Sequence, residues 1–449
     1  MGSGAQYSHA EHLRRVVRLG IPLVVAQLGT MALGVVDTLM LGQVGVHELD
    51  AAALANAWQW GSLVFGMGVM MGLDPIISQA HGAGDPRRLA LALQRGVVVA
   101  LGTSVPITAL WWFTEEGLRL VGQDPQLAQA AGEYARVQWP SIAPFLIYLG
   151  LRSYLQGRRI VAPAVWIMLI ANGFNIVGNW ALIWGHLGLP PLGLIGAGIA
   201  TGATRSFLCV GTLAWIFAFG LHRAAWIPWS REAVARRGLR EVLDHGLPVG
   251  LQYSLESWAF HGSTLLAGWL GKLELAAHAI VFNLAAVSFM MPLGVSMAAA
   301  TTVGNHIGAR QPEDALRSAW VSFALGGLVM ALSAAVFVGL RWELPVLYTA
   351  DSQVVAIAAA TLPVAATFQI FDGVQAVGGG VLRGMGNTRP AVHFNFLGYY
   401  VLGLPAGAYL AFVADYGLQG LWWGFAIGLS CVAILLILWV KIRGPRQVS

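Results

Sequence analysis

Apolar residues fill twelve long stretches of this chain, and short polar segments separate them. Each stretch has the roughly 20 mostly apolar residues that a helix needs to cross a bilayer. The pattern therefore predicts an all-α integral membrane protein with twelve transmembrane helices. The expected spans are 18–42, 52–80, 91–113, 131–156, 161–185, 192–220, 244–270, 276–305, 315–340, 354–382, 390–413 and 418–441.

The composition supports a membrane protein. Hydrophobic residues make up 57% of the chain and charged residues 10%, whereas about 25% of the residues of a soluble domain are charged. The surface of this protein must therefore face lipid. Both cysteines, Cys209 and Cys431, lie in apolar spans, so we expect neither a disulfide nor a cysteine metal site.

The basic residues predict the orientation. With the N-terminus in the cytoplasm, most of the 26 Lys and Arg residues fall at the cytoplasmic ends of the spans, as the positive-inside rule requires. The exceptions are Arg119, Arg136, Lys272 and Arg341 at the outer ends, and Arg205 within a span. Both termini are therefore expected in the cytoplasm. Because the basic residues are spread over all inner loops, the net charge of +5 does not indicate nucleic-acid binding.

The two halves of the chain repeat one another. Four sets of glycines and prolines recur in the same order at a fixed offset of 226 or 227 positions. They are Pro22 with Pro248, Gly42 and Gly45 with Gly268 and Gly271, Gly82 and Pro86 with Gly308 and Pro312, and Gly157 and Pro163 with Gly384 and Pro390. Each half holds six spans, so we expect two parallel six-helix lobes, 1–220 and 244–449, joined by a cytoplasmic linker at 221–243. Such repeats rock against each other around a central site.

Three acidic residues lie inside predicted spans: Asp37, Glu256 and Asp372. A charge at the centre of a bilayer costs at least about 2.5–3.5 kcal/mol, and ionisable groups there are functional by default. The alternative is a protonated or paired acid that only holds helices together. Three such acids suggest a coupled transporter.

Polar residues in the first half could share a pocket with Asp37. Asn175 and Asn179 are one helical turn apart and share a face, and Thr201 and Arg205 lie in the following span. For the asparagines, hydrogen bonding between helices is an equally good interpretation. For Arg205, pairing with a buried acid or a carbonyl cluster is favoured over contact with substrate.

In the second half, Glu256 and Asp372 would repel each other if they lie close together. One of them would then hold a proton, or the pair would bind a metal cation such as Na⁺, which favours oxygen ligands. Neighbouring side chains that could add oxygens, or could only bond to the acids, are Gln252, Tyr253, Ser257, Gln369 and Gln375. Aromatic and methionine side chains that could line a cavity for flat cations, or could face the bilayer instead, are Trp58, Trp60, Trp258, Phe260, Trp269 and Met290.

Three stretches resemble the NorM branch of the multidrug and toxic compound extrusion (MATE) family. They are LGIPLVVAQLGTMALGVVDTLMLGQVG (19–45), LPVGLQYSLES (247–257) and FQIFDGVQAVGGGVLRGMGNTRP (368–390), and the likeness covers nearly the whole chain. The resemblance implies efflux of lipophilic organic cations in exchange for Na⁺ or H⁺, by a multi-pass protein of the bacterial inner membrane. It also implies that Asp37, Glu256 and Asp372 are the membrane-embedded acids of that branch. We expect a monomer.

One departure from the branch leaves the coupling ion open. Some relatives have a tyrosine one turn before the acid that matches Asp372, where this chain has Phe368. The loss of that hydroxyl removes a candidate ligand for Na⁺.

Three other classes of protein compete with this interpretation. A lipid-linked saccharide flippase of related architecture would need a large cationic cavity, whereas the buried charge here is mostly acidic. An enzyme would need a nucleophile, a metal set or a cofactor site, and the sequence has no such motif. A channel fits less well because repeats around central acids favour alternating access. We therefore expect a transporter, with no catalytic residues and no cofactor.

Overall fold

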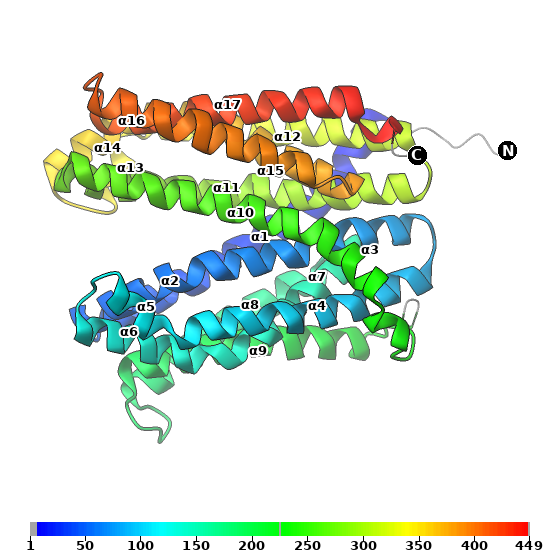
Figure 1. The fold of residues 1–449 in the computed structure, drawn as a ribbon, viewed down its shortest axis with the longest axis horizontal. Coiled ribbons are helices and arrows are strands. Elements are labelled where there is room, and N and C mark those ends of the chain that lie inside the picture. The colour runs from blue at the N-terminus through cyan, green and yellow to red at the C-terminus, as the bar shows by residue number, and fades with distance from the viewer. Residues whose placement is uncertain (1–6, 224–225, 448–449) are drawn as a thin grey trace. The chain divides into compact units, whose positions relative to one another are not determined.

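The computed structural model describes residues 7–223 and 226–447, and in these ranges every regular element is a helix (Figure 1). In chain order the helices are α1 (His9–Leu41), α2 (Val46–Met71), α3 (Leu73–Gly82), α4 (Pro86–Trp112), α5 (Thr114–Leu120), α6 (Pro125–Gln138), η1 (Trp139–Ser141), α7 (Ile142–Gly157), α8 (Ala162–Trp184), α9 (Gly193–Ala218), η2 (Arg231–Val234), α10 (Arg236–Leu270), α11 (Lys272–Gly308), α12 (Pro312–Gly339), α13 (Glu343–Val346), α14 (Ser352–Met385), α15 (Arg389–Phe396), η3 (Leu397–Gly403), α16 (Leu404–Phe412), α17 (Gly417–Arg443) and η4 (Pro445–Gln447).

All twelve predicted spans are helical, which confirms the predicted fold class. Nine helical segments of the described chain are long and apolar enough to cross a membrane. The other three predicted spans correspond to α6–η1–α7, to α10 and to α15–η3–α16. Two of these three change helix type along their length: η1 is a 3₁₀ turn, and η3 is a π-helix of seven residues.

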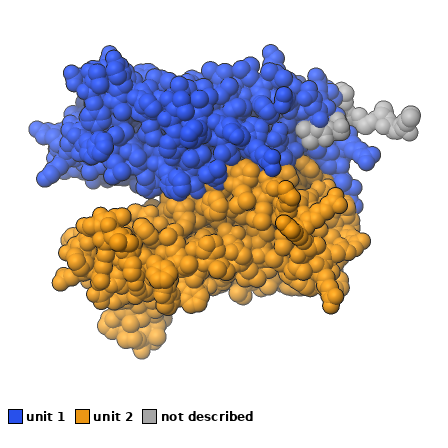
Figure 2. All heavy atoms as spheres, viewed as in Figure 1, with its two compact units in different colours: residues 1–24, 82–84, 251–449 blue, residues 25–81, 85–250 orange. Residues whose placement is uncertain are grey.

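The chain forms two compact units (Figure 2). Unit 1 comprises the chain up to Val24, Gly82–Gly84, and the chain from Leu251 onward, and unit 2 comprises Val25–His81 and Asp85–Gly250. Two unit boundaries therefore fall inside α1 and α10. The units differ here from the predicted lobes, because the first part of α1 belongs with the later half of the chain and the first part of α10 with the earlier half. Moreover, α10 begins at Arg236, inside the predicted linker.

Two segments are exchanged between the halves of the chain: α1 up to Val24, in unit 1, and α10 up to Gly250, in unit 2. A close helix crossing joins each exchanged segment to the rest of its unit. In unit 2, a Cβ atom on Gly68 would lie 2.5 Å from the Cα atom of Gly250. In unit 1, a Cβ atom on Gly294 would lie 2.7 Å from the backbone nitrogen of Val24. Gly294 follows Gly68 by 226 positions, and Gly250 follows Val24 by the same number. The two crossings are therefore equivalent in the repeat. Glycine at these crossings lets the backbones approach more closely than a side chain would permit.

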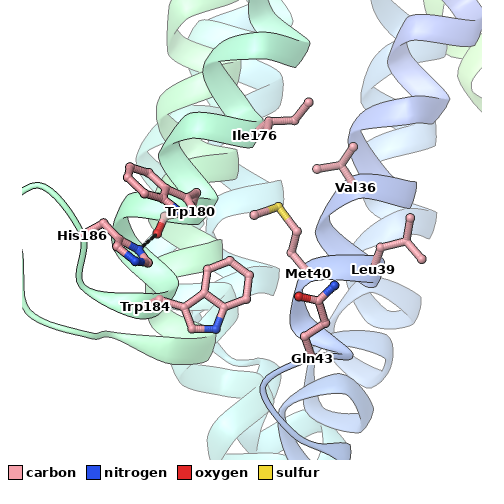
Figure 3. Close-up of a pocket in the computed structure, with 8 residues that line it drawn as sticks. All are labelled: Val36, Leu39, Met40, Gln43, Ile176, Trp180, Trp184 and His186. Carbon is pink, nitrogen blue, oxygen red and sulfur yellow. Dashed lines mark hydrogen bonds between the residues drawn. The ribbon is translucent and has the colours of Figure 1, made fainter.

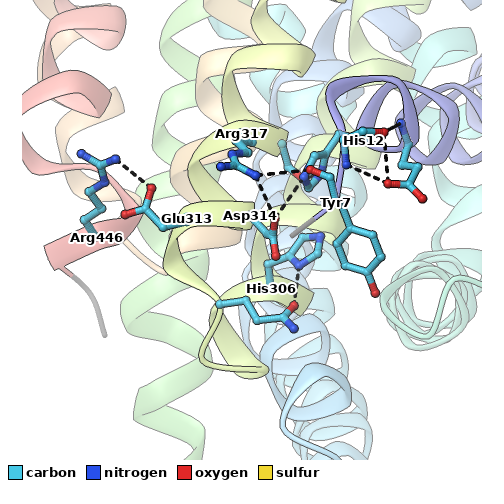
Figure 4. A network of polar contacts seen from close by, with 11 residues as sticks. Tyr7, His12, His306, Glu313, Asp314, Arg317 and Arg446 are labelled. Atoms are coloured by element: carbon cyan, nitrogen blue, oxygen red, sulfur yellow. Dashed lines mark hydrogen bonds and ion pairs between the residues drawn. The ribbon is translucent and has the colours of Figure 1, made fainter. Parts of the chain in front are cut away.

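A polar network fixes the start of α1 within unit 1 (Figure 4). The His12 side chain is fully buried, and its Nε2 atom lies 3.3 Å from Oδ1 of Asp314 on α12. The Oγ atom of Ser318, one turn further along α12, lies 2.8 Å from His12 Nδ1. Arg317 also donates a hydrogen bond of 3.3 Å to the carbonyl of Tyr7. Both imidazole nitrogens of His12 are thus engaged by a single neighbouring helix.

Unit 1 has an aromatic core. Phe260, expected as a possible cavity wall, packs at right angles to Phe368 with ring centroids 6.0 Å apart, and its centroid lies 4.8 Å from that of Phe425. Trp422 is fully buried and meets the edge of Phe368 at 5.5 Å. Trp60, Trp258 and Trp269 are exposed. Phe260 thus packs against neighbouring rings of its own unit and is partly buried.

Candidate functional site

The Asp37 side chain is bonded at both carboxylate oxygens. The Nδ2 atom of Asn179 on α8 donates to Oδ1 at 2.6 Å, and the hydroxyl of Thr201 on α9 donates to Oδ2 at 2.6 Å. Asn179 also donates to Oδ1 of Asn175 at 3.3 Å. Asp37 is only 6% exposed. The structure thus brings together four of the polar residues that the sequence placed in one pocket, on α1, α8 and α9, and fixes the orientation of the carboxylate.

Arg205 lies one helical turn after Thr201 on α9. It donates a hydrogen bond of 3.1 Å to Oε1 of Gln138, and its guanidinium lies over the rings of Trp111 and Phe145, at 5.4 and 5.8 Å from their centroids. Its partner is thus a side-chain amide, although its positive charge still acts on Asp37. Arg205 therefore contributes to the electrostatics of the pocket while its head group is held by neighbouring side chains.

A broadly open cavity of about 640 Å³ lies between α1 and α8 (Figure 3). Its α1 side includes Val36, the residue before Asp37, and its α8 side is aromatic. Trp180 and Trp184 line it, and the ring of His186 stacks on that of Trp180 with centroids 4.1 Å apart. These aromatic residues were missing from the sequence prediction. Their spacing was the available signal: Trp180 and Trp184 are one turn apart, and Trp180 directly follows Asn179.

Glu256 and Asp372 are both buried in unit 1, with 7% and 4% of their surfaces exposed. Gln375, nearly one turn after Asp372 on α14, donates to Oε2 of Glu256 at 3.3 Å and to Oδ1 of Asn395 at 3.4 Å. The negative charge of Glu256 also acts on Asp372. The two acids therefore belong to one site, and Gln375 connects the helices that carry them.

Several oxygen atoms at this site have no hydrogen-bond partner among the described residues. They are Oδ1 of Asp372, Oε1 of Gln369 and Oε1 of Gln375. Buried polar atoms are almost always bonded in proteins, so unbonded oxygens indicate a missing partner such as a water or an ion. A group of carboxylate and amide oxygens suits a proton or a hard cation.

The other predicted neighbours of the two acids have different partners. The hydroxyl of Tyr253 accepts a hydrogen bond of 3.3 Å from Arg383, which is almost fully buried on α14. Gln369 directs its amide nitrogen to the hydroxyl of Ser288 at 2.9 Å, and Ser257 is half-buried one residue after Glu256. Arg383 is one of the basic residues that the orientation prediction places at the cytoplasmic ends of the spans. It is also a buried cation whose charge acts on Glu256.

Twelve helical spans with buried carboxylates in both units define a multi-pass membrane transporter. The family model MatE matches residues 22–181 and 248–409, and the chain belongs to this family. A probable multidrug resistance protein NorM of Bradyrhizobium diazoefficiens is 36% identical, with 100% of this chain and 97% of the relative aligned. The multidrug resistance protein NorM of Burkholderia vietnamiensis is 35% identical, over 97% of this chain and 95% of the relative. The family resemblance of the sequence is thereby confirmed.

Solved structures agree on the fold. The crystal structure of the eukaryotic MATE transporter AtDTX14 has a TM-score of 0.90 at 24% identity, covering 98% of each chain. An outward-facing multidrug resistance transporter of the MATE family has a TM-score of 0.88 at 20% identity, covering 99% of each chain. At these identities the likeness establishes the architecture.

Proposed function

We propose that this protein is a secondary active antiporter that exports lipophilic organic cations in exchange for Na⁺ or H⁺. The observation that carries the proposal is the pair of buried acids in unit 1, Glu256 and Asp372, connected by Gln375 and with one carboxylate oxygen unbonded among the described residues. The names of the NorM relatives support a multidrug substrate range. We place the protein in the bacterial inner membrane as a monomer with both termini in the cytoplasm.

The organic cation binds at Asp37 and the adjoining cavity. Aromatic faces attract cations through their quadrupoles, and Trp180 and Trp184 supply such faces beside an apolar wall. The Asp37 carboxylate adds a fixed negative charge, because donors on both of its oxygens hold it in one orientation. This combination suits lipophilic cations better than neutral or anionic compounds.

The coupling ion binds at Glu256 and Asp372. The two carboxylates would hold Na⁺ or a proton, with the side-chain oxygens of Gln369 and Gln375 available nearby. When bound, the ion neutralises part of the negative charge that the two acids share. Arg383 supplies a permanent positive charge on the same unit. Part of the negative charge of the acids is therefore compensated even when no ion is bound.

Exchange follows from competition for negative charge. The organic cation enters from the cytoplasm while the acids are charged, and the protein then opens to the outside. Binding of Na⁺ or H⁺ there weakens the attraction for the organic cation, which leaves. The ion-loaded protein returns and releases the ion inward. The protein moves its substrates without changing them chemically.

The test uses purified protein in liposomes with ethidium inside and either a Na⁺ or a proton gradient directed inward. We expect one gradient to drive ethidium out. Glu256→Gln and Asp372→Asn should abolish the dependence on the gradient, while Asp50→Asn, a change at an exposed acid, should leave it intact. Full gradient-driven efflux by Glu256→Gln contradicts the assignment. Efflux under neither gradient would favour the saccharide flippase instead.

A further inference from the structure

The π-helix η3 brings two consecutive tyrosines to the helix that carries Glu256. A π-helix closes i→i+5 hydrogen bonds, and π-bulges are frequent at functional sites. The Tyr400 hydroxyl donates a hydrogen bond of 2.9 Å to the carbonyl of Leu255, the residue before Glu256. The preceding residue, Tyr399, is only 1% exposed, and its ring meets that of Phe260 on the same α10 helix.

Ring contacts connect Tyr399 to the helices of both acids of unit 1, directly to α10 and through Phe260 to α14. Its centroid lies 6.1 Å from that of Phe260, one helical turn after Glu256. Phe260 in turn contacts Phe368, at 6.0 Å, one turn before Asp372. Tyr399 thus contacts the turn after Glu256 directly and is linked through Phe260 to the turn before Asp372, and the charges of both acids act on its phenol group.

The hydroxyl of Tyr399 has no hydrogen-bond partner among the described residues. A buried hydroxyl without a partner destabilises a protein, so such a group needs an explanation. Oδ1 of Asp372 lacks a partner in the same part of the chain. A hydroxyl that can donate and a carboxylate oxygen that can accept thus lie in one buried region, each unbonded. The hydroxyl can donate to such a carboxylate oxygen, and the two oxygens can both face one bound cation.

We propose that Tyr399 is a further residue of the ion-coupling site. Its hydroxyl donates to a carboxylate of Glu256 or Asp372 when that acid is charged, and its oxygen faces the monovalent cation when the cation is bound. The inference rests on the proposed function of these two acids. It assigns η3 a role as well: the π-helix turns Tyr399 inward while Tyr400 anchors the backbone beside Glu256.

The test compares Tyr399→Phe with Tyr409→Phe, a matched loss of a hydroxyl at an exposed tyrosine of the same span. Ethidium efflux from liposomes is measured over a range of Na⁺ concentrations and, separately, of external pH. Tyr399→Phe should raise the concentration of the driving ion that gives half-maximal efflux by about tenfold. The maximal rate and the thermal unfolding midpoint without ion should stay near wild type. Tyr409→Phe should match wild type throughout.

A second hydroxyl separates a role in ion binding from a role in packing. Phe368→Tyr, added to Tyr399→Phe, returns a hydroxyl to the same aromatic cluster one turn before Asp372, and it should restore part of the ion affinity. The proposal would be overturned if, for both ions, the concentration that gives half-maximal efflux in Tyr399→Phe stays within twofold of the wild-type value. A lower unfolding midpoint and a lower maximal rate, unrescued by Phe368→Tyr, would overturn it too.

Glu256→Gln in the same assay distinguishes the two levels of inference. If Glu256→Gln keeps normal ion dependence, the proposed coupling site and the role of Tyr399 both fail. If Glu256→Gln loses ion dependence while Tyr399→Phe behaves like wild type, only the role of Tyr399 fails. Both the coupling site and the role of Tyr399 are supported if Glu256→Gln loses ion dependence and Tyr399→Phe needs a higher ion concentration for half-maximal efflux.

Discussion

Asn179 donates a hydrogen bond of 2.6 Å to Oδ1 of Asp37, and this contact joins α8 to α1 within unit 2. Thr201 on α9 donates an equally short bond to the other oxygen. The first bond is buried and the second partly buried. Both are charge-assisted when the acid is ionised, which makes them stronger than bonds between neutral groups. The orientation of the carboxylate therefore depends on residues from two other helices.

The first prediction concerns this amide. Asn179→Ala should lower the transport efficiency for ethidium by roughly 10- to 100-fold, because a hydrogen bond to a charged group contributes about 1.5–3 kcal/mol. The matched control is Asn172→Ala on the same helix, whose amide bonds the backbone carbonyl of Gly29. Initial efflux rates at several ethidium concentrations measure the effect. Equal losses in both variants would argue for a general packing role of the asparagines.

The second prediction concerns the aromatic cavity. Trp180→Ala should raise the KM for ethidium about 2- to 30-fold, since a cation–π contact contributes about 0.5–2 kcal/mol. Trp166→Ala, at an exposed tryptophan of the same helix, should leave KM unchanged. The ion concentration for half-maximal efflux should not move in either variant. An unchanged KM in Trp180→Ala would remove the cavity from the substrate site.

The third prediction concerns the crossing at Gly68. Gly68→Ala should destabilise the protein by about 1–3 kcal/mol, the usual cost of overpacking, because the added methyl group would meet the backbone of Gly250. Gly102→Ala is the control, since a Cβ atom there meets nothing within 4 Å. Thermal unfolding in detergent, with the remaining folded protein measured by size-exclusion chromatography, should show a lower midpoint for Gly68→Ala alone. A midpoint equal to wild type would mean that the crossing can spread without cost.

The fourth prediction concerns the start of α1. His12→Ala should loosen this segment, because it removes the buried contacts to Asp314 and Ser318. Hydrogen exchange of the amides around residues 12–20 should become roughly tenfold faster or more, for a loss of about 1.5–3 kcal/mol. His9→Ala, at an exposed histidine one turn earlier, should exchange like wild type. Unchanged exchange in His12→Ala would show that packing alone holds the segment.

Much of the fold could be predicted because a bilayer imposes length and polarity on the sequence. Pro86, Pro163, Pro312 and Pro390 stand at the starts of helices, where a missing N–H group costs nothing. The membrane-embedded acids could be found for the same reason, since a carboxylate such as Glu256 is conspicuous among apolar neighbours. The pairing of Asp37 with Asn179 followed from helical spacing and the expected proximity of the spans.

Other features depend on neighbours that the local sequence does not reveal. Tyr253 is three residues before Glu256, yet its hydroxyl meets Arg383, 130 positions away. The π-helix at Leu397–Gly403 leaves no clear mark in the hydrophobic pattern, because its residues are apolar or aromatic throughout. The unit boundary between Val24 and Val25 falls inside an uninterrupted helix, so no turn residue marks it. Each of these features is decided by packing between distant segments.

The exchanged segments of α1 and α10 have a consequence for synthesis. The chain up to Val24 belongs to a unit whose remaining residues, apart from Gly82–Gly84, begin at Leu251. At about 5–20 residues per second, a ribosome needs roughly 10 to 50 seconds to reach the first of those partners. Unit 2 in turn lacks its last helix segment until Gly250 has been made. Both units therefore reach their full set of residues only after Gly250 has been made, and a cut at the central connector would separate both segments from the rest of their units.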